Sequence, residues 1–355
     1  MSKGSWVMGD EFLTKNRVGA PVFSPSSQHS ALPVCPMTPL RAGVIGVGHL
    51  GQHHARLYAS LPGAQLVGVT DQSIERAQMI AERHGARVFP SADELLAHVD
   101  VVSVAVPTSG HYAVAKACLQ AGKHLLVEKP IAVTLGEAQE LVQLAKQRGC
   151  CLQVGHSERF NPVMALMRPH IGKPVFIECH RLSSFSERGT DVDVVLDLMI
   201  HDLDLIMSLN PGPVEEVRAA GVAVLSSSID IANARIQFQS GCVANLTSSR
   251  VSTNKMRRLR LFQRDNYVSI DFQSRQGMIC RRNAKAGERP TVEMSHLQGG
   301  DEEPLKLQLE SFLHAITTGT RPVVSGEDGA AAVGVAHQVL QAMAAFASRQ
   351  AEGEG

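Results

Sequence analysis

The feature that most constrains this chain is a regular alternation of short apolar runs with amphipathic segments, which begins at Arg41 and continues to His156. The runs are rich in valine and leucine, as in DVVSVAVP and KHLLVEKP. Near-continuous apolar strands that alternate with helices are typical of a parallel sheet with helices on both faces. We therefore predict a doubly wound domain, with one helix that ends at Ser60 and others over 73–84, 111–121 and 134–148.

The rhythm of the sequence changes after Asn161. Successive runs such as IDIANARIQFQ and GCVANLTSSRV alternate polar and apolar residues and are separated by hairpin-length turns. This pattern indicates an antiparallel or mixed open sheet. We predict a long apolar helix over 194–209 and two closing helices over 305–318 and 326–348, whereas the stretch 283–303 is polar and irregular.

The predicted fold class is thus α/β, in two domains. A doubly wound parallel sheet of the Rossmann type occupies 39–160, and a C-terminal α+β domain with a large open, mostly antiparallel sheet occupies 161–350. Residues 1–38 show neither periodicity nor the charged head and apolar core of a signal peptide. We expect a disordered extension there, or an upstream start that the cell does not use, since Met37 stands just before the first strand.

Composition excludes several classes of partner. The 355 residues are 44% hydrophobic and 19% charged with a formal net charge of zero, as in a soluble globular protein. The one short basic run, 255–260, is too small an electrostatic footprint for nucleic acid. The apolar stretches are far shorter than the ~20 residues that span a bilayer, so we expect no membrane helix. Seven cysteines without a C-x-x-C pair favour reduced thiols and a cytoplasmic location.

A glycine-rich loop follows the first apolar run. Gly46, Gly48 and Gly51 form G-x-G-x-x-G between a strand and a helix. In a dinucleotide site the first glycine makes the turn, the second lets the backbone approach a pyrophosphate, and the third lets helix and strand pack closely. The helix N-terminus then offers free N–H groups to the phosphates. This placement favours dinucleotide binding over a tight turn alone.

Asp71 bears on which dinucleotide binds. It ends the second strand, twenty residues beyond Gly51, where a carboxylate would accept hydrogen bonds from the adenosine ribose. It would repel the 2′-phosphate of NADP, and neither Gln72 nor Ser73 supplies an arginine to neutralise it. We therefore predict NAD, with NADP the less favoured cofactor; an Asp71 that only caps the next helix would suit either. The other residues expected along the cofactor are His49, Leu50, Pro107, Thr108, His111, Glu128 and Lys129.

The histidines of the first helix raise the alternative of a metal site. His49 and His53 are four residues apart, but no nearby Cys, Asp or Glu completes a ligand shell for them or for His54. We therefore predict no metal. His49 would lie near phosphate, and the other two would be surface or packing residues.

Two motifs supply candidate chemistry. Lys129 ends the fifth strand in Glu-Lys-Pro, where open α/β sheets bind ligands, and the proline suits a cis peptide. Partial burial would let this lysine act as an acid or base, or stabilise an alkoxide. On the apolar helix, Asp197, His201 and Asp204 recur on one face, which indicates either a hydrogen-bonded structural group or an active-site face with a titrating imidazole.

A Rossmann loop, then E-K-P, then D-x-x-x-H on a helix of a second sheet-containing domain resembles the Gfo/Idh/MocA family of oxidoreductases over about residues 41–348. The resemblance implies that Lys129 and His201 share the acid/base work and that Asp197 assists. It also implies that the flat face of the second sheet makes an oligomer contact, giving a homodimer or homotetramer.

Within that family, VGHSERFNP and HRLSSFSERGTDVDVVLDLMIHDLD look most like bacterial enzymes that oxidise the 3-hydroxyl of UDP-N-acetylglucosamine for lipid A synthesis. The resemblance implies an aminotransferase that consumes the product. It places four side chains around the nucleotide-sugar: Arg159, Asn161, Arg181 and Arg188. Guanidinium groups match a diphosphate bidentately, although Arg188 would suit a solvated loop equally well.

Two alternatives stay open at this point. One is a dehydrogenase for inositol, a simple sugar or a UDP-sugar acid. The other is a non-catalytic NAD-sensing protein on the same fold, which would need only the glycine loop and Asp71 and has no use for Lys129, Asp197 and His201.

Overall fold

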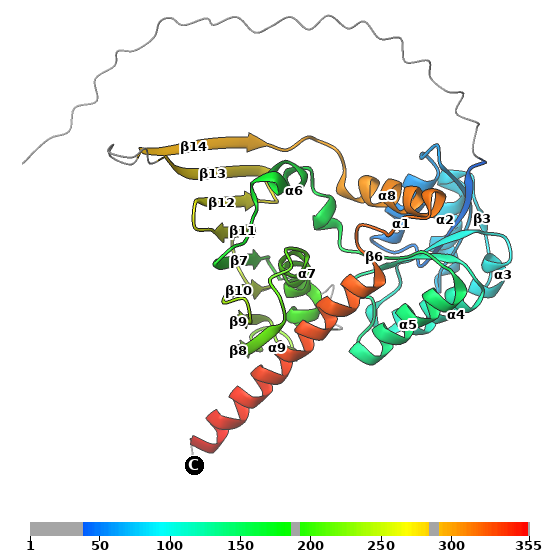
Figure 1. Cartoon of the computed structure of the whole chain (residues 1–355). Coiled ribbons are helices and arrows are strands. Elements are labelled where there is room, and N and C mark those ends of the chain that lie inside the picture. The colour runs from blue at the N-terminus through cyan, green and yellow to red at the C-terminus, as the bar shows by residue number, and fades with distance from the viewer. Residues whose placement is uncertain (1–37, 186–191, 284–290, 354–355) are drawn as a thin grey trace, which may run out of the picture. The chain divides into compact units, whose positions relative to one another are not determined.

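The computed structural model describes residues 38–185, 192–283 and 291–353 (Figure 1). The predicted extension, apart from its last residue, and the candidate substrate residue Arg188 lie outside the described residues.

The first sheet has the predicted parallel architecture. Its strand order is β3-β2-β1-β4-β5-β6, and every pairing is parallel. The strands are β1 Leu40–Ile45, β2 Ala64–Thr70, β3 Arg87–Val88, β4 Val101–Val104, β5 His124–Glu128 and β6 Leu152–Gly155. The order reverses between β1 and β4, and such a switch point opens a crevice at the carboxyl ends of the strands.

Helices cover both faces of this sheet, as the alternating sequence predicts. They are α1 Gly51–Tyr58, α2 Ile74–His84, α3 Ala92–Leu96, α4 His111–Gln120 and α5 Leu135–Arg148. Leu57 and Ile80, from α1 and α2, share one buried cluster with Val44 of β1. Leu119 and Leu141, from α4 and α5, belong to the cluster on the other face. Local signals fix helix starts: Thr134 and Glu137 form a reciprocal capping box at α5.

The second sheet is the large, mostly antiparallel one that was expected. Its order is β14-β13-β12-β11-β7-β10-β9-β8, and only β7 and β10 pair in parallel. The strands are β7 Phe176–Leu182, β8 Val214–Val222, β9 Ile231–Phe238, β10 Val243–Ser249, β11 Met256–Phe262, β12 Asn266–Asp271, β13 Gln276–Asn283 and β14 Thr291–Gln298. Strand β14 corrects the prediction of an irregular stretch over 283–303. It is an edge strand with Val292 and Met294 exposed, so burial imposes no alternation on it.

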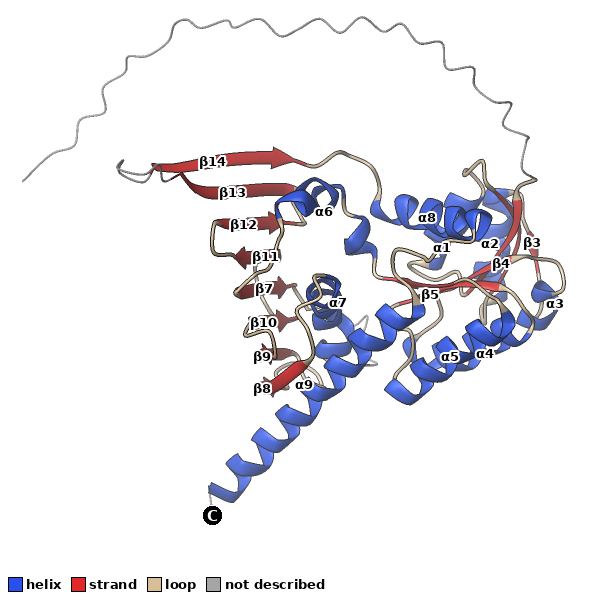
Figure 2. Cartoon of the chain, in the orientation of Figure 1, coloured by secondary structure: helices blue, strands red, loops and turns tan. Residues whose placement is uncertain are grey.

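Helices lie along one face of the second sheet (Figure 2). They are α6 Pro162–Met167, α7 Ile200–Ser208 and α9 Gly326–Gly353, while α8 Pro304–Thr318 packs against α1. The predicted helix 194–209 begins with a π-helical turn, Val195–Met199, before α7. Buried and exposed residues alternate along β9 and β11, because one face meets these helices and the other is open.

The prediction that no segment could span a membrane needs one correction. Residues 326–349 of α9 have a mean hydropathy of 1.4 and are long and apolar enough to cross a bilayer, judged by length and composition. In the structure this helix packs against α5, α7 and β8, and Val333, Ala336 and Val339 are buried. Of this span, 39% is buried against these elements, as in a helix that covers part of a core.

Candidate active site

The glycine loop has the geometry that a dinucleotide needs. Gly46 has a φ of +83°, and a Cβ there would lie 2.8 Å from the carbonyl oxygen of Ala105. A Cβ on Gly51 would overlap the carbonyl oxygen of Gly46. At Gly48 the nearest atom to a Cβ position is a guanidinium nitrogen of Arg76 at 3.8 Å, so the space above this residue is open to a pyrophosphate. The loop therefore fits the cofactor on its own geometry.

Asp71 is fixed by the backbone around it. Its Oδ2 accepts a hydrogen bond from the Val47 N–H at 2.7 Å, and its Oδ1 accepts one from the Ser73 N–H at 2.9 Å. The sequence argument missed Arg76: the first turn of α2 brings its Nη1 to 3.6 Å from Asp71 Oδ1. Gln72 and Ser73 supply no arginine, but Arg76 does, so the negative charge at this site is partly balanced.

The other expected cofactor residues lie at the carboxyl ends of β1, β4 and β5. His49 and Leu50 lie in the glycine loop, with Leu50 exposed. Pro107 and Thr108 lie at a short 3₁₀ turn after β4. The ring nitrogens of His111 lie 2.6 and 2.9 Å from the carbonyl oxygens of Pro130 and Val106. His111 therefore ties this turn to the segment after Lys129.

The two candidate catalytic motifs meet in space. Lys129, at the end of β5, makes a cis peptide with Pro130, as predicted. Its Nζ donates to the main-chain oxygen of Asp197 at 2.6 Å and to Asp197 Oδ1 at 3.0 Å. The side chains of Lys129 and Asp197 are 15% and 22% exposed. Asp197 is thus bonded to the lysine, and no hydrogen bond to His201 is seen in the described part of the chain.

His201 lies on α7, one helical turn beyond Asp197. Its side chain is partly accessible, but Nδ1 is buried without a hydrogen-bond partner in the described residues. Burial, and then the positive charges of Lys129 and Arg181, lower the pKa of His201 well below the ordinary value for histidine. The imidazole is therefore held in its neutral form at physiological pH.

A second histidine, which the sequence argument missed, faces His201. His156 follows β6 at the same edge of the sheet as Lys129. It is 1% exposed, and neither ring nitrogen has a hydrogen-bond partner among the described residues. The rings of His156 and His201 meet edge to face, with centroids 6.1 Å apart. Unpaired buried polar groups are rare in folded proteins, so packing alone does not account for this pair of rings.

The residues expected to hold the nucleotide-sugar are engaged with the protein itself. Arg159 binds both carboxylate oxygens of Asp204, at 2.6 and 2.7 Å. Arg181 is buried and binds both oxygens of Asp202, at 2.9 and 3.1 Å, and Glu158 at 3.1 Å. Asn161 is buried too. Its side-chain oxygen caps α6, and its NH₂ group donates to Glu158 and to the Phe272 carbonyl.

An arginine that sequence reasoning overlooked is more accessible. Arg257 of β11 lies opposite Arg181 in the strand register. Its side chain is 58% exposed, and its Nη1 lies 3.7 Å from Glu158 Oε1. Its charge also contributes to lowering the pKa of His201. The run of arginines in MRRLRLF was visible in the sequence, but only strand pairing shows that this member faces the helices.

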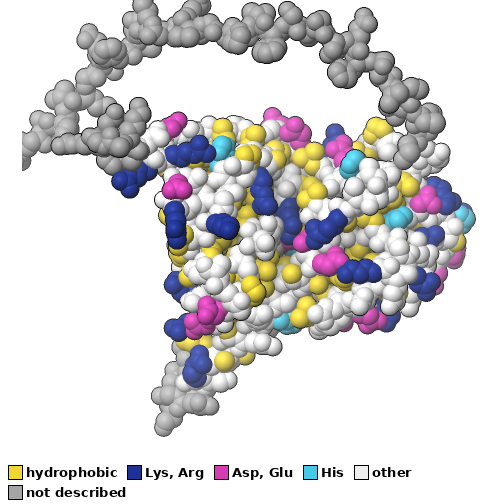
Figure 3. Space-filling view, viewed as in Figure 1, with side chains coloured by type: hydrophobic (Ala, Val, Ile, Leu, Met, Phe, Trp, Pro, Cys, Tyr) yellow, Lys and Arg dark blue, Asp and Glu magenta, His cyan; other side chains and the backbone are white. Residues whose placement is uncertain are grey.

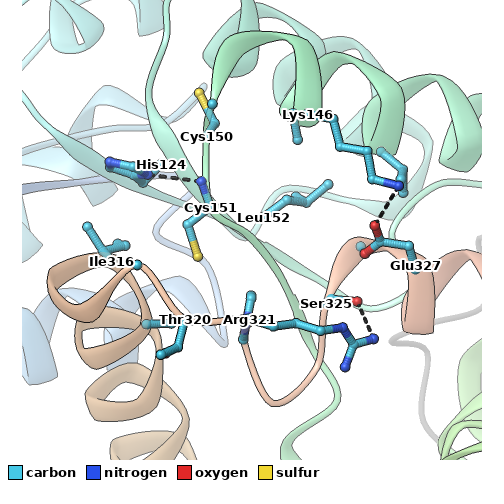
Figure 4. A pocket seen from close by; sticks show the side chains of 17 residues that line it. His124, Lys146, Cys150, Cys151, Leu152, Ile316, Thr320, Arg321, Ser325 and Glu327 are labelled. Atoms are coloured by element: carbon cyan, nitrogen blue, oxygen red, sulfur yellow. Dashed lines mark hydrogen bonds and ion pairs between the residues drawn. The ribbon is translucent and has the colours of Figure 1, made fainter.

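A separate pocket lies away from this chemistry. It has a volume of about 430 Å³ and is lined by residues that include His124, Lys146, Cys151 and Arg321 (Figure 4). His124 begins β5, so the pocket is at the amino ends of the strands, opposite the edge that carries Lys129. An ion pair between Lys146 and Glu327, 2.9 Å long, stands beside it. The cofactor crevice and this pocket are therefore different places.

Comparison with known proteins identifies the family. A family model described as an oxidoreductase family with an NAD-binding Rossmann fold matches residues 40–156, and the model of the Gfo/Idh/MocA C-terminal domain matches residues 166–267. The chain belongs to the Gfo/Idh/MocA oxidoreductase family. The resemblance drawn from the sequence is confirmed, and with it the fold class, the enzyme class and a nicotinamide cofactor.

Individual relatives of this Gfo/Idh/MocA chain include sugar and inositol dehydrogenases. It is 41% identical over 315 residues to the UDP-N-acetylglucosamine 3-dehydrogenase of Acidithiobacillus ferrooxidans, covering 88% of this chain and 100% of that one. A solved structure of that enzyme superposes with a TM-score of 0.82, covering 87% and 99% of the two chains. The myo-inositol 2-dehydrogenase of Thermotoga maritima is 26% identical, with 82% and 92% covered.

Proposed function

We propose that the protein oxidises the 3-hydroxyl of UDP-N-acetylglucosamine to a ketone, with NAD as the oxidant. The carrying observation is the meeting of Lys129, Asp197 and His201 at the carboxyl edge of the first sheet, beside a glycine loop shaped for a dinucleotide. The choice of substrate is supported by the UDP-N-acetylglucosamine 3-dehydrogenase described above, whose whole length aligns with 88% of this chain. A nicotinamide bound at the glycine loop would supply the acceptor for the hydride that leaves the carbon bearing the hydroxyl.

The chain's own residues divide the remaining work. Neutral His201 accepts the hydroxyl proton through its accessible side. Lys129 stabilises the negative charge that develops on the sugar oxygen, since Asp197 holds its ammonium group in place at 3.0 Å. Arg257, on the helix-covered face of the second sheet, supplies an accessible guanidinium for the diphosphate, a role that the paired Arg159 and Arg181 are less free to take.

The test of this assignment is a Lys129→Met variant, with Lys116→Met on α4, a lysine that is likewise ion-paired, as the matched control. We expect Lys129→Met to lose about a thousandfold in turnover of UDP-N-acetylglucosamine, read by reduced-nicotinamide absorbance, and to bind NAD within about threefold of the wild type. A variant as active as the control would refute the role of the lysine. Turnover of free inositol but not of the nucleotide-sugar would refute the substrate.

The choice of NAD over NADP rests on Asp71, and Arg76 works against it. Asp71 would repel a 2′-phosphate, whereas the half-exposed guanidinium of Arg76, 3.6 Å away, would attract it. We expect a preference for NAD that is moderate, about tenfold in dissociation constant. Calorimetric titration with both dinucleotides checks this preference.

We further propose that the enzyme acts in the cytoplasm as a homo-oligomer and passes its ketone to an aminotransferase for lipid A synthesis. The open face of the second sheet supports self-association, because Phe176, Phe262 and Tyr267 gather on it with ring centroids 5.5 and 4.9 Å apart. Acidic and basic side chains are interspersed on the face shown in Figure 3. Light scattering would report the number of subunits.

A further inference from the structure

A line of buried polar side chains runs through the first sheet beneath the glycine loop. It comprises Tyr58 and His54 of α1, Ser103 of β4 and Glu128 of β5, and all four residues are buried. The Tyr58 hydroxyl lies 2.9 Å from Ser103 Oγ. Ser103 Oγ lies 3.0 Å from His54 Nδ1, and His54 Nε2 lies 2.9 Å from Glu128 Oε1. Such a line in an apolar sheet is costly unless every member is satisfied.

The protons in this line can be ordered in one direction that satisfies every group. Tyr58 O–H donates to Ser103 Oγ, Ser103 O–H donates to His54 Nδ1, and the His54 Nε2–H donates to the Glu128 carboxylate. In the opposite direction the Tyr58 hydroxyl would need another acceptor, and its one hydrogen bond in the described chain is to Ser103. The last hydrogen bond of the line is therefore donated by His54 Nε2–H to the Glu128 carboxylate.

Glu128 is consequently held as an anion. Burial acts to raise the pKa of this carboxyl, but the hydrogen bond from His54 and the charge of Lys129 act against it, so that the pKa of Glu128 is lowered. The other titratable groups that interact with it are His111 and His156. The carboxylate packs on Gly155 of β6, where a Cβ would lie 2.7 Å from the Glu128 Cδ.

The position of the line joins two parts of the active site. His54 is three residues beyond Gly51, on the helix whose N-terminus carries the glycine loop. Glu128 directly precedes Lys129. The helix that receives the cofactor and the strand that presents the lysine are thereby bonded to each other through buried groups.

We propose that His54 and Glu128 are positioning residues for Lys129: the hydrogen bond from His54 fixes the Glu128 carboxylate, and with it the end of β5 that presents the lysine, in register with the cofactor helix. This inference rests on the proposed function for the use of Lys129 in turnover, but its physical content can be tested without a sugar.

The first experiment measures the lysine directly. The holoprotein is treated with limiting acetic anhydride at pH 8, and mass spectrometry gives the acetylation of Lys129 relative to Lys146, which is 61% exposed, in the same molecule. Loss of a neighbouring negative charge favours the uncharged, nucleophilic amine. We expect Glu128→Gln to raise this ratio about three- to tenfold. Tyr58→Phe, at the far end of the line, should leave it within about twofold.

The second experiment separates this role from cofactor binding and from the proposed function. In Glu128→Gln we expect kcat for UDP-N-acetylglucosamine to fall about tenfold while the NAD dissociation constant changes less than threefold. An unchanged acetylation ratio, an equal rise in Tyr58→Phe, or a loss confined to NAD affinity would overturn the inference. If Glu128→Gln does not fold, His54→Gln replaces it with the same expected direction. If the wild-type protein oxidises no sugar but Glu128→Gln still raises the acetylation ratio of Lys129, the proposed function is refuted and the inference stands.

Discussion

Two sets of polar side chains lie on helix α7 or beside it, and they differ in whether they have partners. Arg159 and Arg181 are paired with carboxylates through charge-assisted bonds of 2.6 to 3.1 Å. His156 and the Nδ1 atom of His201, a few residues away, have no partner in the described chain. Paired groups hold the two sheets and their helices together, whereas an unpaired buried group weakens the fold and is retained for another purpose. The contrast distinguishes arginines that stabilise the fold from histidines that are available for the reaction.

The largest effect is expected from the unpaired set. His201→Asn removes the proton acceptor, so kcat should fall about a thousandfold. The midpoint of thermal unfolding should hardly move, because no hydrogen bond of the described chain is lost. Steady-state kinetics beside calorimetry tests both halves. A large loss of stability together with activity would place His201 among the architectural residues.

Removal of a paired group should show the reverse pattern. Arg181→Met leaves Asp202 and Glu158 as buried carboxyls without their cation, which we expect to lower the free energy of unfolding by about 3–5 kcal/mol. Chemical denaturation gives this value. If Arg181→Met is as stable as the wild type and has lost only affinity for the nucleotide-sugar, the original assignment of Arg181 to the substrate is restored.

Arg257 should fall between the two sets. Arg257→Gln removes a guanidinium that is half-exposed and makes one loose ion pair, so stability should stay within about 0.5 kcal/mol of the wild type. Loss of a diphosphate contact should raise KM for the nucleotide-sugar about tenfold. Arg258→Gln, on the next residue and the opposite face of β11, is the control that should leave KM unchanged.

The smallest effect concerns pH. Burial lowers the pKa of His156, so the folded state keeps this imidazole neutral while the unfolded chain takes up a proton below about pH 6.5. Stability is then present above that pH and is lost as the pH falls. His156→Phe should remove up to about 1 kcal/mol of this loss per pH unit. Unfolding curves at pH 7.5 and 5 measure it, and an equal acid sensitivity in the variant would contradict the neutral state.

The sequence predicted those parts of the fold that burial dictates. The strands of the first sheet are covered on both faces, so their apolar runs and the glycine turn were readable, and Lys129 and His201 could be chosen. Strand β14 was not predicted because an exposed edge imposes no pattern. Helix α3, Ala92–Leu96, was missed because five residues carry too little periodicity.

The ion pairs and hydrogen bonds of the charged residues could not be predicted from the sequence. Arg181 and Asp202 are twenty-one positions apart, and their pairing depends on how α7 lies on β7. The burial of His54 depends on which face of α1 meets β4. Arg76 returns to Asp71 only through the turn that starts α2. Residue type and spacing suggested a diphosphate site for Arg159 and Arg181, but tertiary contacts decide whether a guanidinium is available.

The double anchor of Lys129 has a consequence for how this site can change. The ammonium group is held by the main-chain oxygen of Asp197 at 2.6 Å and by its carboxylate at 3.0 Å. The first acceptor is a main-chain atom of the π-helical turn, so it does not depend on the side chain at position 197. The second acceptor is lost when Asp197 is replaced by a residue without a carboxylate. The position of the ammonium group and the negative charge beside it can therefore change independently, so a substitution at Asp197 can alter the charge near Lys129 while the main-chain hydrogen bond is kept.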